Sequence, residues 1–168
     1  MAMAEQEPRL LAIAVRHRSR GTMQELAEAK VTREGGVADD FRGRPGRRQV
    51  TVLSLESWQA ACRQAGRPDL PWTTRRANLL VSGVDLAAAG VLRIGEVELE
   101  VTGETAPCER MDEAFDGLRA ALTPAWRGGV TCRVLRPGAV HPGAPVSAHQ
   151  ARAPDSPAHV PGDPAGVR

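Results

Sequence analysis

Short apolar runs, each bounded by glycine, proline or polar residues, are the feature of this sequence that most limits its possible folds. Residues 10–15 (LLAIAV) form a nearly continuous apolar run, which is typical of a buried strand. Residues 97–102 alternate apolar and polar side chains, and a turn at Gly95-Glu96 joins them to residues 91–94 in a predicted hairpin. Other strands are expected at 48–53, 76–81, 130–135 and, as a short last strand, within 139–146.

Two helices are expected among these strands. Ser54 can cap a helix over 54–65, because its hydroxyl can accept a hydrogen bond from the free N–H groups of the first turn. The second helix is expected over 112–122, with Asp112 as its cap and Pro124 beyond its end. Both segments repeat apolar residues every three or four positions, so each helix should bury one face.

Many short strands with few helices predict a mainly β (α+β) fold. Residues 23–32 fit either a helix or a strand, and residues 35–48 are expected to form a long loop because glycine and arginine dominate them. The order of elements lacks the regular alternation of a doubly wound sheet. We therefore expect a closed or partly closed β-barrel with two or three short helices.

The 168 residues are enough for one domain with an ordinary core. We expect an N-terminal extension over 1–9, the domain over 10–147, and a disordered tail rich in proline, alanine and glycine over 148–168. No run is long enough to span a membrane and no signal peptide is recognisable, so a cytoplasmic location without a membrane partner is expected. A net charge of +2 and 3% aromatic residues argue against nucleic acid as a partner.

The three cysteines have different surroundings in the sequence. Cys62 lies on the apolar stripe of the first helix and Cys132 on the inward face of a strand, so both are expected in the core. Cys108 instead lies in a loop, after Pro107 and near Arg110 and a helix N-terminus, where a thiolate is favoured. Nearby acidic residues oppose this effect. The local sequence leaves open whether Cys108 is a reactive group or an incidental exposed thiol.

Two groups of polar residues could bind a ligand. On a strand over 76–81, Arg76 and Asn78 would share one face, which suits either a polar ligand or solvent. The loop over 41–48 holds arginines 42, 44, 47 and 48 among glycines, and this combination suits an anion such as phosphate. A mobile charged loop would explain the same composition.

Three motifs stand out between residues 76 and 111. They are Arg76-x-Asn78-Leu79-Leu80-Val81-x-Gly83-Val84-Asp85-Leu86, Leu92-Arg93-Ile94-Gly95-Glu96-Val97-x-Leu99-x-Val101-Thr102 and Pro107-Cys108-x-Arg110-Met111. Together with the upstream segments 36–39 and 48–54, these motifs resemble the MOSC domain, which is found at the C-terminus of molybdenum-cofactor sulfurases. The resemblance covers residues 10–147. Family members often have glycine at the position of Ala38 and Gly-Asp at the positions of Gly143-Ala144.

The resemblance implies a β-barrel with Cys108 at a cofactor site. In related proteins the matching cysteine either ligates the molybdenum of a pterin cofactor or is proposed to carry sulfur as a persulfide. Arg110, Arg76 and Asn78 would hold the anionic cofactor, and Arg47 and Arg48 could contribute. Pyridoxal phosphate is a label of the full-length sulfurases only, because this chain lacks their desulfurase domain and shows no site for that cofactor.

Three functions follow from the resemblance. The first is a stand-alone MOSC domain that binds molybdenum cofactor or carries sulfur on Cys108, with a cysteine desulfurase as the sulfur donor. The second is a molybdenum-dependent reductase of N-hydroxylated compounds, which would need an electron-donor protein as partner. The third is a non-catalytic binding module. Whether the chain is an enzyme is left open, and an enzyme would perform sulfur transfer or N-reduction.

Overall fold

The computed structural model describes residues 7–150, and they form two β-sheets with three α-helices and three short 3-10 helices. The strands are β1 (Arg9–Val15), β2 (Gln24–Leu26), β3 (Ala29–Thr32), β4 (Gly36–Val37), β5 (Val50–Ser54), β6 (Leu79–Ser82), β7 (Val91–Ile94), β8 (Val97–Glu104), β9 (Val130–Arg136), β10 (Gly138–Val140) and β11 (Val146–His149). The helices are α1 (Leu55–Ala65), η1 (Trp72–Arg75), η2 (Leu86–Ala88), α2 (Glu109–Ala114), α3 (Leu118–Leu122) and η3 (Pro124–Trp126). None of the described helices is long and apolar enough to cross a membrane.

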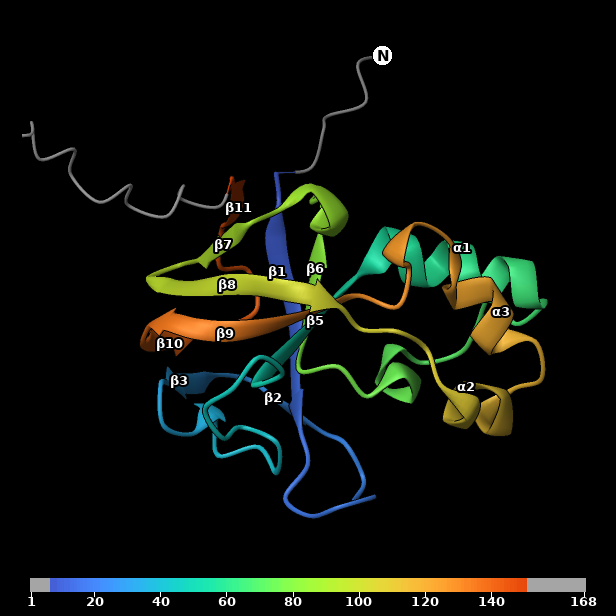
Figure 1. The fold of residues 1–168 in the computed structure, drawn as a ribbon, viewed down its shortest axis with the longest axis horizontal. Helices are drawn as coiled ribbons and strands as arrows, with labels where there is room; N and C mark the ends of the chain where they lie inside the picture. Colours follow the sequence, from blue (N-terminus) through green and yellow to red (C-terminus); the bar gives the residue numbers. More distant parts are fainter. Residues whose placement is uncertain (1–6, 151–168) are drawn as a thin grey trace, which may run out of the picture.

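The larger sheet is mixed and has eight strands in the order β11-β7-β8-β9-β5-β6-β1-β2. Only β5 and β6 run parallel, and helix α1 lies in the crossover between them, as a parallel pair requires. The smaller sheet has the order β10-β3-β4. In Figure 1 the strands lie together on one side of the molecule, and α1, α2 and α3 gather on the other side.

The larger sheet curls, so that its β11 end approaches β1. Leu10 N donates to Ala144 O at 2.9 Å, and Val146 N donates to Pro8 O at 3.1 Å, so the segment that leads into β11 lies beside β1. The hydrogen-bonded order nevertheless has two ends, β11 and β2. The expected mainly β fold with two or three short helices is therefore confirmed, in the form of a curled mixed sheet.

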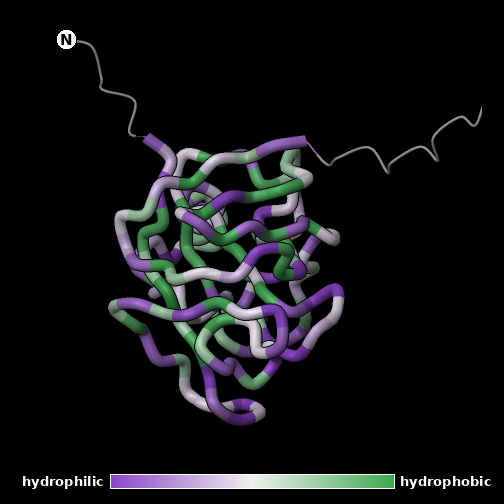
Figure 2. Tube along the Cα trace, turned by 90° about the vertical axis from the view of Figure 1, so that its left-hand side faces the viewer, coloured by the Kyte–Doolittle hydropathy of each residue, from purple (hydrophilic) through white to green (hydrophobic). Residues whose placement is uncertain are grey.

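Strands β5 and β6 are buried on both faces, and this divides the core into two clusters. Val52 of β5 and Leu79 of β6 point into the curled sheet, while Leu53 and Leu80 pack against Trp58 and the other buried residues of the helical layer. Successive strand residues point to opposite faces, so one short strand can serve both clusters. Figure 2 shows hydrophobic and hydrophilic residues alternating along much of the trace.

The first predicted helix and the predicted hairpin are both confirmed. Ser54 lies at the N-cap of α1, and its hydroxyl accepts a hydrogen bond from Ser57 N at 3.3 Å. Gly66 ends the helix in the left-handed conformation. Strands β7 and β8 pair as an antiparallel hairpin.

The predicted strand over 76–81 is wrong at its N-terminal end. The chain forms η1 up to Arg75, turns at Arg76 with a φ of 65°, and enters β6 only at Leu79. Arg76 and Asn78 therefore do not share the face of one strand. The reason is local, because Arg76 N closes the 3-10 turn by donating to Thr73 O.

The second predicted helix is also wrong in its boundaries, since two short helices replace it. Helix α2 begins at Glu109, with Cys108 rather than Asp112 at its N-cap. The chain then breaks before α3 at Gly117, which has a φ of 88° that favours glycine. The Asp112 carboxylate accepts a hydrogen bond from Arg119 N at 3.1 Å, so this side chain supports α3 instead.

The segments left open by the sequence are mostly extended. Residues 23–32 form β2 and β3, and the predicted loop over 35–48 contains the short strand β4. Residues 139–146 contribute to two strands, β10 and β11, instead of one, and β11 continues to His149. The rest of the predicted tail, and residues 1–6 of the predicted extension, lie outside the described residues.

Ala38 adopts a backbone conformation that glycine usually occupies. Its φ is 44°, and the next residue, Asp39, has a φ of 57°. Side chains with a Cβ rarely adopt this left-handed region. A glycine at this position would relieve that strain, whereas the fold here is retained with alanine.

Candidate functional site

The candidate site is a cavity of about 360 Å³ where the curled sheet meets the helical layer. Segments that are distant in the sequence contribute to it: the end of β1, the loop before β5, the turn after η1, and the connection from β8 to α2. Its lining residues are Arg16, Arg42, Arg48, Thr51, Arg75, Arg76, Ala77, Thr105, Ala106, Cys108, Arg110, Met111 and Gly128.

Cys108 is held at this cavity by the start of α2. Its carbonyl accepts a hydrogen bond from Met111 N at 3.0 Å, and the Met111 side chain is buried in the helical cluster. Cys108 itself is exposed, whereas Cys62 and Cys132 have no exposed surface. The expected core positions of Cys62 and Cys132 are confirmed, and burial raises the pKa of both thiols.

Native protein should therefore present a single thiol to an alkylating reagent. We expect iodoacetamide at mildly alkaline pH to label Cys108 alone, because Cys62 and Cys132 are shielded and their thiols resist ionisation. Intact-mass measurement should show one adduct in native protein and three in guanidinium chloride. Rapid native labelling of a second cysteine would contradict this arrangement.

Arg75 links the segment that leads from β8 to Cys108 with the segment that precedes β9. Its guanidinium is buried and donates from Nε to Gly128 O at 3.0 Å and from Nη2 to Thr105 O at 2.8 Å. Gly128 is required here, because an added Cβ would lie 2.6 Å from Thr105 O. Burial lowers the pKa of Arg75, and the negative charge that Cys108 carries as a thiolate partly offsets that effect.

The remaining arginines repel one another across the cavity. The pKa of Arg16 is lowered by burial and then by the charge of Arg76, and the pKa of Arg76 is lowered by burial and then by Arg110. Asp40 is the acidic group that opposes both shifts, and its carboxylate is already bonded to the backbone N–H groups of Arg16 and Arg42. Such a concentration of positive charge favours an anionic ligand.

Several polar atoms in this cavity have hydrogen-bonding capacity left over. Arg16 Nε, Arg76 Nε and Thr105 Oγ1 are buried without a hydrogen-bond partner among the described residues. Within residues 7–150, none of the six cavity arginines forms an ion pair. Buried polar groups are normally satisfied, so the lining residues Arg16, Arg76 and Thr105 retain unused hydrogen-bonding capacity next to the cavity.

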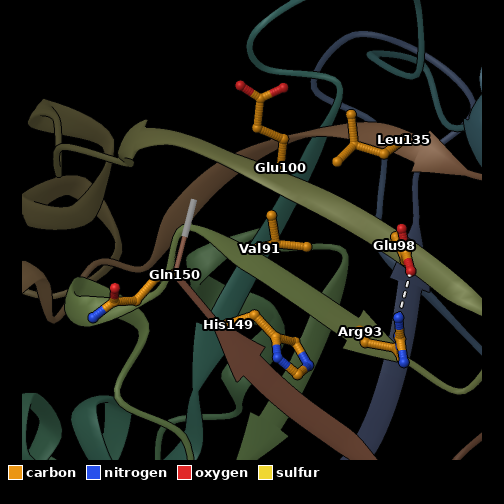
Figure 3. Close-up of a pocket in the computed structure, with 7 residues that line it drawn as sticks. All are labelled: Val91, Arg93, Glu98, Glu100, Leu135, His149 and Gln150. Carbon is orange, nitrogen blue, oxygen red and sulfur yellow. Dashed lines mark hydrogen bonds and ion pairs between the residues drawn. The ribbon is translucent and has the colours of Figure 1, made fainter. Parts of the chain in front are cut away.

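A second hollow, of about 590 Å³, has a different character. It lies over β7, β8 and β11, and Figure 3 shows its Arg93 and Glu98 side chains joined to each other. Their nitrogen and oxygen atoms are 2.8 Å apart, and Glu100 is paired with Arg133. Because these charges are paired within the protein, and because no cysteine lines this hollow, the cavity at Cys108 is the stronger candidate for chemistry.

Comparison with known families decides the relationship. The sequence profile of the MOSC domain matches residues 9–147. The chain belongs to the MOSC domain family. The domain boundaries expected from the sequence, 10–147, stay a prediction. The family is associated with the molybdenum cofactor, and the Cys108 cavity lies within the matched region.

Solved structures with the same fold include three bacterial proteins. The YuaD protein from Bacillus subtilis has a TM-score of 0.68 and 22% identity, and the match covers 86% of this chain and 98% of that one. YiiM from Geobacillus stearothermophilus has a TM-score of 0.67, 18% identity and coverages of 85% and 75%. YiiM from Escherichia coli has a TM-score of 0.64, 18% identity and coverages of 88% and 72%. No curated protein matches this MOSC chain significantly.

The MOSC fold brings three of the predicted binding residues together with Cys108: Arg48, Arg76 and Arg110 all line the cavity. Arg47 lies outside it, where its Nη2 donates to Thr102 O at 3.2 Å and it lines a neighbouring hollow. The binding roles of these residues stay predictions.

Asn78 is buried beside the cavity, but it is not one of the residues that line it. Its Oδ1 accepts a hydrogen bond from Thr51 N at 3.1 Å, and its Nδ2 donates to Ala14 O at 3.2 Å. The amide therefore links β1, β5 and the segment that enters β6. A cofactor-binding role for Asn78 stays a prediction.

Sequence reasoning missed Arg16, Arg75 and Thr105 as site residues. Arg16 follows directly after the apolar run of β1. This position was the available signal, because binding residues often lie in the loops that follow the elements of a rigid scaffold. Arg75 had no such signal. Its importance depends on burial and on contacts with Thr105 and Gly128, which are far from it in the sequence.

Proposed function

We propose that this MOSC domain binds a molybdenum–pterin cofactor in the Cys108 cavity, with the Cys108 thiolate directed at the metal. The observation that carries the proposal is the combination of one exposed thiol with six arginines that form no ion pair within the described residues. Guanidinium groups suit the phosphate of the cofactor, and a thiolate is a soft ligand for its metal. When bound, the cofactor would supply a redox-active metal centre.

The donor set of the cavity fits a metal that arrives within its own organic ligand. Among the described residues, no group of three or more histidine, cysteine, aspartate or glutamate side chains could hold a metal ion. A bare ion would therefore have Cys108 as its main protein ligand, which is too few for stable binding. A pterin-borne metal needs only one further ligand from the protein, and the arginines can bind the anionic part of the cofactor.

The protein's own contribution would be to bind and orient the cofactor. Arg16, Arg76 and Thr105 line the cavity, and their unpartnered Nε and Oγ1 atoms would donate to phosphate or pterin oxygens once these side chains turn toward the ligand. Arg75 would keep the Thr105–Cys108 segment in place, because it is fixed at both Thr105 O and Gly128 O. The amount of positive charge favours this function over sulfur carriage alone, since a persulfide carries no more than one negative charge.

Native mass spectrometry and metal analysis test the proposal directly. Protein purified from a host that makes the cofactor should contain molybdenum and pterin in nearly equal amounts to the chain. Protein from a host that lacks the cofactor pathway should contain neither. Absence of both from the first preparation, with the protein folded and Cys108 unmodified, would contradict the proposal.

Neutralising two cavity arginines should weaken cofactor retention without unfolding the protein. We expect the variant Arg16→Gln/Arg76→Gln to retain roughly a tenth or less of the wild-type molybdenum, because each charged hydrogen bond to phosphate contributes about 1.5–3 kcal/mol. Metal analysis after gel filtration measures this loss. The exposed pair Arg63→Gln/Arg119→Gln removes the same charge from α1 and α3 and should retain wild-type content.

Sulfur carriage is a second candidate, because Cys108 is accessible to a donor protein. A cysteine desulfurase would then leave a persulfide on this thiol, and intact-mass measurement would detect one added sulfur that reducing agents remove. Reductase activity toward N-hydroxylated compounds would require bound molybdenum and an electron-donor protein. Turnover that depends on both would assign that reaction to the cofactor-loaded domain.

A further inference from the structure

A second basic surface adjoins the Cys108 cavity and includes arginines that the proposal above does not use. It is formed by residues 41–48, here called the arginine loop, and all of them except Gly43 line a hollow of about 510 Å³. Arg42 and Arg48 line both this hollow and the Cys108 cavity, so the two are continuous. The loop contains four arginines and no acidic residue.

The arginine loop is held in one shape at both ends. At its start, the Asp40 carboxylate accepts a hydrogen bond from Arg42 N at 3.1 Å, and Asp40 O accepts one from Gly43 N at 2.8 Å. At its end, the buried Gln49 side chain donates to Gly43 O at 3.0 Å. Gly43 is packed so closely that a Cβ would lie 1.8 Å from Gly35 O. The backbone is therefore anchored at Arg42 and Gly43, directly before Arg44.

The composition and exposure of the loop suit a macromolecule more than a small ligand. Every residue of the loop except Gly43 is exposed, whereas small ligands are usually bound in enclosed sites. Phe41 is 46% exposed, and it is the exposed large hydrophobic residue of the described part of the chain. An aromatic side chain among arginines is typical of the residues that dominate protein–protein interfaces.

We propose that the arginine loop is a docking surface for a protein with an acidic patch, which would be brought to the mouth of the Cys108 cavity. The proposal rests on the proposed function, because a cofactor or sulfur site at Cys108 needs a protein that reaches it. Opposite charges steer the approach of the partner, and Phe41 would supply the apolar contact at the centre of the interface. Arg44 has no other role in the site, so it reports on docking alone.

The test uses full-length protein from a host without the cofactor pathway, so it is independent of cofactor binding. The probe is poly-L-glutamate, which represents the acidic patch of the partner. The measurement is the rate at which a maleimide-linked polyethylene glycol labels Cys108. This reagent is too bulky to reach Cys108 when a polyglutamate chain is bound beside the cavity. Wild-type protein should be protected, with the labelling rate reduced about tenfold. Arg44→Glu should lose that protection, while Arg63→Glu on α1, a matched charge reversal, should keep it.

Further measurements distinguish a protein-docking surface from a site for nucleic acid or a small anion, and they separate this proposal from the proposed cofactor site. Phe41→Ala should weaken protection by a glutamate–tyrosine copolymer, whose aromatic side chains can contact Phe41, more than protection by polyglutamate. Arg44→Glu should retain the wild-type molybdenum content when the protein is made with cofactor. No protection by polyglutamate, or equal loss in Arg44→Glu and Arg63→Glu, would overturn the docking surface. Equal protection by an oligothymidylate would assign the surface to nucleic acid, and complete displacement of polyglutamate by equimolar pyrophosphate would assign it to a small anion.

Discussion

Cys108→Ser should purify without molybdenum from a host in which the wild-type protein carries it. We expect at least a hundredfold lower metal content, since the substitution removes the one exposed soft ligand of the cavity and leaves only a hard hydroxyl. Stability should change by less than about 0.5 kcal/mol, because Cys108 is exposed and contributes to neither apolar cluster. Metal analysis and urea unfolding of the same preparation measure both quantities.

Cys62→Ser is the matched control for this result. The same atomic change in the helical cluster should leave the molybdenum content at the wild-type level and lower the free energy of unfolding by about 1–3 kcal/mol, because it buries a hydroxyl. Full metal retention in both Cys108→Ser and Cys108→Ala would show that the Cys108 thiol is not needed for metal binding. If Cys62→Ser also lost its metal, the loss in Cys108→Ser would be explained by reduced folding and not by removal of a metal ligand.

Asn78→Ala should lower the free energy of unfolding by about 2–4 kcal/mol. The buried amide accepts a hydrogen bond from Thr51 N and donates to Ala14 O, so its removal leaves buried backbone groups of two strands unpaired. These bonds lie at the junction of β1, β5 and the segment that enters β6. Urea unfolding followed by circular dichroism measures the change.

Gln59→Ala provides the comparison, because Gln59 also carries an amide but is exposed on α1. Its replacement should change the free energy of unfolding by less than about 0.5 kcal/mol. The comparison also tests the cofactor-binding role predicted for Asn78 from the family resemblance. An Asn78→Ala variant with wild-type stability and no molybdenum would assign the amide to the ligand instead of to the strands.

The boundaries that sequence reasoning placed correctly depend on near neighbours. The cap at Ser54, the helix end at residue 65 and the β7–β8 hairpin each require residues within a few positions of one another, and all three are present. The errors fall where a local turn competes with a periodic pattern. At Arg76 a 3-10 turn delays β6, and at Gly117 a left-handed residue divides the expected helix.

The sequence by itself determined that the fold is mainly β, that Cys62 and Cys132 are core residues, and that Cys108 lies in a loop before a helix. These properties follow from periodicity and local backbone preferences, which short segments carry on their own. Only the tertiary structure decided that Arg16, Arg75 and Thr105 join Cys108 in one cavity while Arg47 lies outside it. Such convergence depends on how a curled sheet brings distant segments together, and no local pattern encodes the distance between them.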